Sequence, residues 1–216
     1  MVFSSLTFLY LFLPLSLLFH YSTKNDLFRN IFLTIFSLVF YAWAEPMWIF
    51  LMVFTALFDY STGLYIEKKR GTPWAKVGLI ASIVVNIGLL VAYKYGGFIY
   101  DNLNYLFPLP FDRPQNSLPV GISFYTFMVI SYVVDIYRGE IKAQRNPLNF
   151  LMFISLFQHL VAGPIVRYSQ ISEQVEKRTI DWSRMSDGVT RFCIGLFKKV
   201  AIANVAGVLV DKYLDT

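Results

Sequence analysis

Apolar residues occur in long runs separated by short polar stretches, and this pattern predicts a membrane protein. The runs show no alternation of period two, so helices and not barrel strands are expected to cross the bilayer. About 20 apolar residues match the thickness of the hydrocarbon layer. The predicted membrane segments are residues 2–20, 27–44, 46–66, 77–97 and 119–137, an interrupted segment at 148–165, and 188–213. We therefore expect an all-α, multi-pass helical bundle in a single membrane domain.

Composition supports this class. Of the 216 residues, 56% are hydrophobic and only 15% are charged, whereas a soluble domain has about 25% charged residues. The net charge of +5 comes from loops between apolar runs, which favours a basic cytoplasmic face over nucleic-acid binding. The first run lacks a basic start and a cleavage site, so we interpret it as a retained membrane segment.

Basic loops predict the orientation of the segments. Residues 67–76 contain four basic residues and 138–145 contain three, so both loops are expected in the cytoplasm. The loop at 98–118 has a single base, Arg113, and is expected outside. Counting back along the chain places the amino terminus outside.

The segment at 148–165 is predicted to be a re-entrant hairpin on the cytoplasmic side. If it crossed the membrane, the basic stretch 167–184 would lie outside. Gly163 and Pro164 supply the helix break that a hairpin needs. Because non-helical backbone at membrane depth must be packed in protein or line a water-filled cavity, we expect FQHLVAGPIVRY (157–168) to line a cavity.

This stretch also holds the sharpest candidate residues. His159, beside Gln158, either binds substrate and relays a proton, or only satisfies backbone groups freed at the break. The second interpretation is favoured because no second base is at hand. Arg167 is either a cytoplasmic anchor or a phosphate contact. Since only Arg167 adjoins the Gly-Pro pair, replacing Arg167 is expected to reduce the activity of the protein more than replacing Arg178.

Two aspartates lie within predicted helices. Tyr132 and Asp135 share a stripe of the helix at 119–137 and are candidates for a tunnel wall, although an ion pair of Asp135 with Arg138 is the favoured interpretation. Asp59 either pairs with a basic residue of a neighbouring helix or lines a path. No metal site is predicted, because no second His or Cys stands at ligand spacing.

The last segment, 188–213, is amphipathic in its first half. Its basic residues are expected at the cytoplasmic interface before the helix turns inward. They either contact a phosphate-bearing donor or bind acidic lipid headgroups, and the second is favoured. The residues concerned are Arg191, Lys198 and Lys199.

Several stretches, in order along nearly the whole chain, resemble the amino-terminal half of membrane-bound O-acyltransferases of the alginate O-acetyltransferase branch. The resemblance is carried by MVFSSLTFLYLFLPL (1–15), FYAWAEPMW (40–48), LPVGISFYTFMVISYVVDIYRGE (118–140), HLVAGPIVRY (159–168) and GVTRFCIGLFKKVAIAN (188–204).

The resemblance implies a bacterial inner-membrane enzyme without a bound cofactor. It would take an acyl group from a cytoplasmic donor, acetyl-coenzyme A or an acylated carrier. A tunnel bordered by residues 158–167 would lead to hydroxyls of an extracytoplasmic polysaccharide or to periplasmic acetylation proteins. The family's catalytic histidine is expected in a tryptophan- and histidine-rich stretch that 1–216 do not contain, so we assign no catalytic residue and expect this portion to be inactive alone.

Two other functions stay open. A transporter would line a path with Asp59, Asp135 and the hairpin, and would be expected to show an internal repeat, which we do not find. A non-catalytic membrane scaffold would recruit acetylation partners.

Overall fold

The computed structural model describes residues 3–107, 110, 112–113, 118–160, 163–178 and 181–214. It is 82% helical, and no strand occurs in the described residues. Four helices in this part of the chain are long and apolar enough to cross a membrane: Asp26–Ala44, Pro46–Lys68, Pro73–Leu106 and Trp182–Tyr213. The predicted all-α, multi-pass membrane class is confirmed.

The helices follow the predicted apolar runs closely, with turns of π or 3-10 geometry at several junctions. In chain order they are α1 (Leu13–Ser22, after a π turn at Phe8–Phe12), α2 (Asp26–Ala44), α3 (Ile49–Lys68, after a 3-10 turn at Pro46–Trp48), α4 (Pro73–Leu90), α5 (Gly96–Leu106, joined to α4 by a π turn at Val91–Tyr95), α6 (Ile122–Arg138), α7 (Pro147–Ser155), α8 (Phe157–Leu160), α9 (Tyr168–Glu176), α10 (Trp182–Phe197) and α11 (Asn204–Leu214, joined to α10 by a π turn at Lys198–Ala203).

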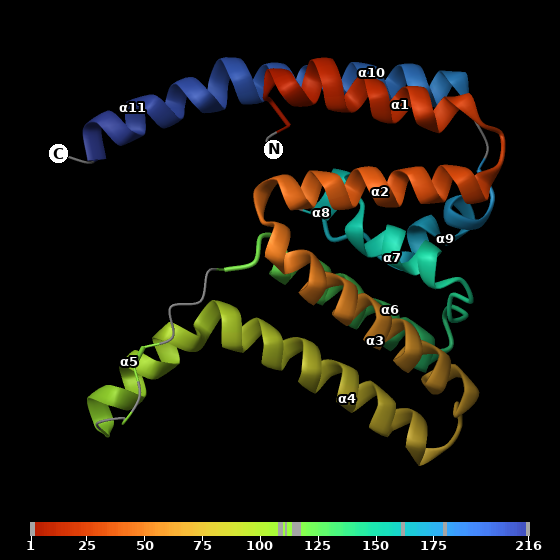
Figure 1. Ribbon diagram of the computed structural model, residues 1–216, viewed down its shortest axis with the longest axis vertical. Helices are drawn as coiled ribbons and strands as arrows, with labels where there is room; N and C mark the ends of the chain where they lie inside the picture. Colours follow the sequence, from red (N-terminus) through yellow and green to blue (C-terminus); the bar gives the residue numbers. More distant parts are fainter. Residues whose placement is uncertain are drawn as a thin grey trace.

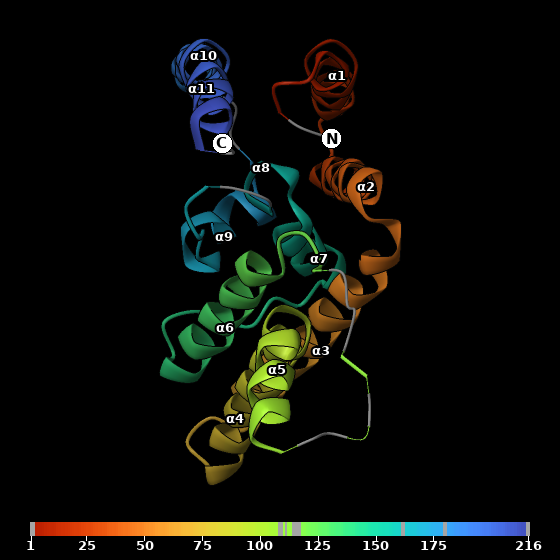
Figure 2. The same cartoon turned by 90° about the vertical axis from the view of Figure 1, so that its left-hand side faces the viewer.

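The helices are stacked in layers (Figure 1). The order runs from α1 and α10–α11, through α2 with α7–α9, to α3 with α6, and then to α4 and α5. Seen from the side, α1 and α10 stand apart above α2 and α8 (Figure 2). The connections 23–25, 69–72 and 139–146 lie at one end of the layers, on the right of Figure 1, and those at 45–48 and 118–121 lie at the other. The loops predicted to share one membrane face therefore gather at one end.

Residues 98–106, predicted as part of an outer loop, are helical. They form α5, which continues α4 after the π turn and bends away from it (Figure 1). Gly96 and Gly97 weaken a helix by about 1 kcal/mol each relative to alanine, which is too little to end one. A π turn beside a glycine pair is instead typical of a kink.

The interrupted segment consists of two short helices and a non-helical return. Its nine-residue α7 rises only about 14 Å, less than half of the hydrocarbon thickness. The helix first breaks at Leu156, earlier than the predicted break at Gly163, whose φ of +125° favours glycine. From α8 the chain returns to α9, at the end of the stack where α7 begins (Figure 1). Gly121 allows the end of α8 to approach closely, because a Cβ at this position would lie only 2.7 Å from the carbonyl oxygen of Leu160.

The main core lies where α3, α6, α7 and α9 meet. Tyr132 of α6 is fully buried there, with its ring centroid 4.4 Å from that of Phe150 and 5.3 Å from that of Tyr168. Its hydroxyl accepts a hydrogen bond from the backbone N–H of Gln144 (2.9 Å), and the Gln144 amide donates to the Tyr168 hydroxyl (2.6 Å). Gly63 of α3 lets this ring approach. Tyr132, a tunnel candidate by sequence, is thus packed in the core.

Replacing Gly63 by alanine is expected to destabilise the bundle. The new Cβ would lie 2.9 Å from Cε1 of Tyr132 and 3.0 Å from Cδ1 of Ile136. Overpacking of this kind costs about 1–3 kcal/mol and should lower the thermal unfolding midpoint measured in detergent. Gly88→Ala is the matched control, since nothing lies within 4 Å of its Cβ. Equal midpoints for the two variants would contradict the close approach of α3 and α6.

Reporters fused after Arg145 and after Arg178 are expected to lie on the same, cytoplasmic, side of the membrane. The two positions flank the hairpin and the return to α9, so a hairpin that does not cross keeps them together. Alkaline phosphatase fusions, active only outside the cytoplasm, provide the measurement. Activity for one fusion and not for the other would mean that 148–165 crosses the bilayer.

Candidate functional site

The largest cavity near the predicted tunnel stretch lies between α1 and α10. Its volume is about 900 Å³. The walls come from the helices that stand apart in Figure 2, and the floor comes from α2 and α8. Most of the lining is apolar, including Phe8, Leu17, Phe157 and Phe192. A cavity of this size and character can hold a small ligand or an acyl chain.

Two of the predicted tunnel residues line this cavity. Gln158 of α8 is exposed to it, and its amide makes no hydrogen bond within the described part of the chain. Gly163 lines the same space. The early break at Leu156 sets the direction of α8, so that Phe157 packs into the aromatic cluster of Phe8, Phe12 and Phe40 while Gln158 faces the cavity. An unpaired amide can bind a carbonyl or a hydroxyl of a ligand.

His159 points the other way. It is 9% exposed, and its Nε2–H donates to the carbonyl oxygen of Phe153 (2.9 Å). The helix break at Leu156 leaves carbonyls near the end of α7 without helical partners, and the imidazole satisfies one of them. This geometry agrees with the prediction that His159 satisfies backbone groups freed at the helix break. His159 does not line the cavity.

Arg167 and Pro164 lie in the non-helical segment that leads from the hairpin back to α9, and both are exposed. Arg167 precedes α9, and its backbone N–H donates to the side chain of Gln170 (3.2 Å). By contrast Arg178, the residue expected to matter less, is half-buried. Because replacing a half-buried residue can change stability, Arg178 is not a suitable control for Arg167. The exposed Lys177 is a suitable control.

The expected ion pair between Asp135 and Arg138 is not formed. Arg138 lies beside Glu140 instead, with Nη1 3.8 Å from Oε1, because the chain turns at Gly139 in a left-handed conformation and brings Glu140 to the helix end. Asp135 is 3% exposed, and its Oδ2 has no hydrogen-bond partner among the described residues. The carboxylate does not line the cavity between α1 and α10.

Asp59 is bound by neutral donors, not by a basic residue. It is fully buried between α3 and α4, where the Ser82 hydroxyl donates to Oδ1 (2.5 Å) and the Asn86 amide donates to Oδ2 (2.8 Å). Two donors from one neighbouring helix compensate much of the cost of burying the carboxyl group. The predicted basic partner is therefore not found among the described residues, and the path stays a prediction.

The basic residues of the last segment are all exposed. Arg191 belongs to α10, and Lys198 and Lys199 to the π turn that follows. No residue in the apolar stretch of 182–213 is buried by the described part of the chain. Arg191, Lys198 and Lys199 do not line the cavity.

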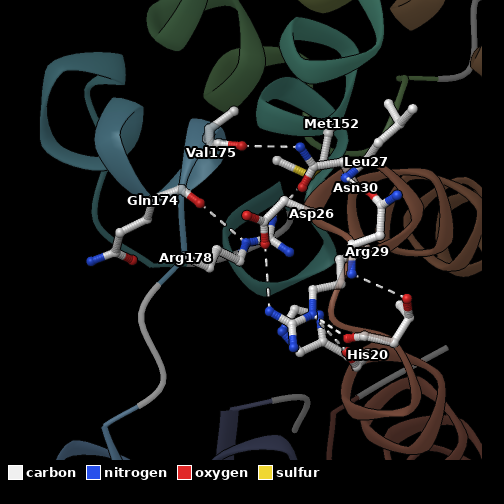
Figure 3. Close-up of polar contacts among 11 residues, drawn as sticks. His20, Asp26, Leu27, Arg29, Asn30, Met152, Gln174, Val175 and Arg178 are labelled. Atoms are coloured by element: carbon white, nitrogen blue, oxygen red, sulfur yellow. Dashed lines mark hydrogen bonds and ion pairs between the residues drawn. The ribbon is translucent and has the colours of Figure 1, made fainter.

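A second, polar pocket adjoins the cavity and was missed by the sequence analysis. Its volume is about 270 Å³, and it is lined by His20 and Tyr21 of α1, Gln174 of α9, Arg178, and Asp181, Arg184 and Met185 at the start of α10. Arg29 secures the end of α1 nearby, donating from Nε to the carbonyl oxygens of His20 (3.2 Å) and Thr23 (2.8 Å) (Figure 3). His20 and Tyr21 line both spaces.

Sequence patterns offered little to find this pocket. More than 150 residues separate His20 from Arg178, and no spacing or motif links them. The one available signal was the set of charged residues at the ends of apolar runs, and that signal is equally typical of ordinary positive-inside loops.

Relatives with assigned names match the chain over nearly its whole length. The probable alginate O-acetylase AlgI of Pseudomonas aeruginosa is 40% identical over 98% of this chain and 41% of its own length. The protein of the same name in Pseudomonas putida is 39% identical over 98% of this chain and 44% of its own length. A peptidoglycan O-acetyltransferase of Helicobacter pylori is 29% identical over 100% of this chain and 47% of its own length.

The chain therefore spans less than half the length of these relatives. No family profile and no solved structure matches it. The similarity extends along the stretches that carry the resemblance, since the matches cover 98% or more of the chain. The resemblance to membrane-bound O-acyltransferases of the alginate O-acetylase branch is thereby confirmed.

Proposed function

We propose that this chain is the amino-terminal part of a bacterial inner-membrane O-acetyltransferase. The donor, acetyl-coenzyme A or an acetylated carrier, is on the cytoplasmic side, and the acceptor is a hydroxyl of an extracytoplasmic polysaccharide. The supporting observation is the cavity between α1 and α10, which is lined by Gln158, the residue directly before the stretch HLVAGPIVRY (159–168) that carries part of the resemblance.

The reaction requires four events. The acceptor hydroxyl oxygen attacks the acetyl carbonyl carbon, a base takes the hydroxyl proton, the carbon–sulfur bond of the donor breaks, and a thiol leaves after protonation. The described residues support only a positioning role here. The Gln158 amide can donate to a substrate carbonyl or accept from a hydroxyl, which fixes one reactant against the other. The base is expected outside residues 1–216, as the family resemblance implies.

The predicted orientation agrees with this direction of transfer. The end of the stack that carries the loops 69–72 and 139–146 also carries the polar pocket around Arg178. A cytoplasmic position of that end follows from the positive-inside rule. With that end in the cytoplasm, the amino terminus would lie outside, and both ends of the hairpin would lie on the side of the donor.

Gln158→Ala is expected to reduce polysaccharide acetylation about tenfold, the effect of losing one positioning hydrogen bond, without lowering protein abundance. The variant should be introduced at the chromosomal gene, so that it is tested in the protein that the cell makes. Acetyl groups released from the polymer by mild base provide the measurement. Wild-type acetylation in Gln158→Ala would overturn the role of the cavity.

His159→Ala should behave differently, and it is the matched comparison. Loss of the hydrogen bond to Phe153 and of the buried ring should reduce the free energy of unfolding by about 1–3 kcal/mol. The unfolding midpoint and the protein level should fall as a result. Activity per molecule of protein should fall less than in Gln158→Ala. A stable His159→Ala protein without activity would instead make His159 a catalytic residue.

Arg167→Ala is expected to reduce acetylation more than Lys177→Ala. Arg167 adjoins the Gly-Pro return, and both side chains are exposed, so neither change should alter stability. Polymer acetylation normalised to protein level is the readout. Equal acetylation for the two variants would remove the case for Arg167 as more than a surface charge.

A further inference from the structure

Arg178, in the polar pocket, forms no ion pair with the residues that the structure describes. Nε of Arg178 donates to the carbonyl oxygen of Gln174 (3.1 Å), and Nη2 lies 3.5 Å from Sδ of Met152 (Figure 3). Both acceptors are neutral. Nη1 is buried and has no hydrogen-bond partner among the described residues. Burial lowers the pKa of the guanidinium, Asp26 opposes this effect and Arg29 adds to it. A half-buried guanidinium that forms no ion pair is stabilised by a bound anion.

The carboxylates near the pocket are already engaged. Asp26 pairs with Nη1 of Arg29 (3.4 Å). Asp181 caps α10 by accepting from the N–H of Ser183 (2.9 Å), and its other oxygen lies 3.4 Å from Nε of Arg184. These two carboxylates balance Arg29 and Arg184, so one net positive charge remains, and Arg178 and Arg184 both line the pocket that an incoming anion would enter. Nδ1 of His20 is also buried without a partner, and in the tautomer protonated at Nδ1 it is a further donor.

The neighbouring cavity favours a ligand that also carries an apolar group. His20 and Tyr21 form the border between the two spaces. On the far side of this border, aromatic and aliphatic side chains line most of the 900 Å³ cavity. A free inorganic anion would use only the pocket, whereas a molecule with a phosphate at one end and an acyl chain at the other would fill both.

We propose that an anionic phospholipid binds here, with its phosphate on Arg178 and Arg184 and an acyl chain in the cavity between α1 and α10. The pocket belongs to the end of the stack assigned to the cytoplasmic face, where anionic lipids are concentrated. This inference is independent of acetyl transfer, and the test needs no enzymatic activity.

The experiment is lipid binding to the purified chain in a neutral detergent, measured by native mass spectrometry. Phosphatidylglycerol and phosphatidylcholine with identical acyl chains are the probes. Phosphatidylglycerol should bind about fivefold more tightly, the effect of one basic residue near an anionic headgroup. Arg178→Gln and Arg184→Gln should each abolish this preference, and Lys177→Gln should leave it intact. The Arg184 side chain is 82% exposed, so its replacement preserves the fold even if that of Arg178 does not.

A second pair of variants tests the acyl chain. Gly195 lines the cavity and Gly188 does not, and nothing lies within 4 Å of a Cβ at either position of α10. Gly195→Phe should therefore weaken both lipids by filling the cavity, while Gly188→Phe should weaken neither. Equal binding of the two lipids, or a preference that survives in Arg184→Gln, would overturn the proposal.

The donor is the alternative occupant, and the same assay distinguishes it. If acetyl-coenzyme A binds the lipid-free protein in an Arg178-dependent manner, and also displaces phosphatidylglycerol when it is added to the lipid complex, the pocket is a donor site and the lipid proposal is wrong. If acetyl-coenzyme A leaves lipid binding unchanged, the lipid proposal is supported.

Discussion

One buried phenol organises this bundle. The Tyr132 ring lies against Gly63 of α3, Phe150 of α7 and Tyr168 of α9, and its hydroxyl binds the loop before α7 through the N–H of Gln144. Lipid offers helices little hydrophobic drive to associate, so close packing and internal hydrogen bonds supply the specificity. Tyr132 supplies both at one point. The hairpin is secured to the long helices there, and the position of α8, and hence of Gln158, follows from it.

Polar groups elsewhere follow the same principle of pairing across helices. The amide of Asn30 on α2 donates to Asn149 of α7 (2.8 Å) and to the carbonyl oxygen of Val175 on α9 (3.0 Å). Asp59 is satisfied by Ser82 and Asn86 in the same way. Among the groups without a partner in the described residues, the amide of Gln158 borders the cavity, and Nη1 of Arg178 and Nδ1 of His20 border the polar pocket, whereas Oδ2 of Asp135 borders neither space. Unsatisfied polar groups at the edge of a cavity are where a ligand gains most from binding.

The class of the fold could be predicted from the apolar runs because each run only has to be long enough to cross a bilayer. Helix ends were harder to predict: α4 continues through a π turn into α5, which begins with Gly96 and Gly97, and α7 ends at Ser155, where no proline or glycine marks a break. The cavity stretch was found because Gly163 and Pro164 interrupt a membrane segment. The orientation of Gln158 and His159 was not predictable, since it depends on a break that comes from tertiary packing. The pocket of His20 and Arg178 joins opposite ends of the chain, and local patterns carry no information on such contacts.

The exposure of α10–α11 links the cavity to the thickness of the bilayer. No residue in the apolar stretch of 182–213 is buried by the described part of the chain, so these helices do not fix its tilt, and the match between its apolar length and the hydrocarbon layer contributes to it. Since α10 is one wall of the cavity and the firmly packed α2 and α8 are its floor, a change in tilt alters the width of the opening. Membranes with longer or shorter lipid chains would then hold the same protein with a narrower or wider cavity, which makes lipid chain length a variable of the site.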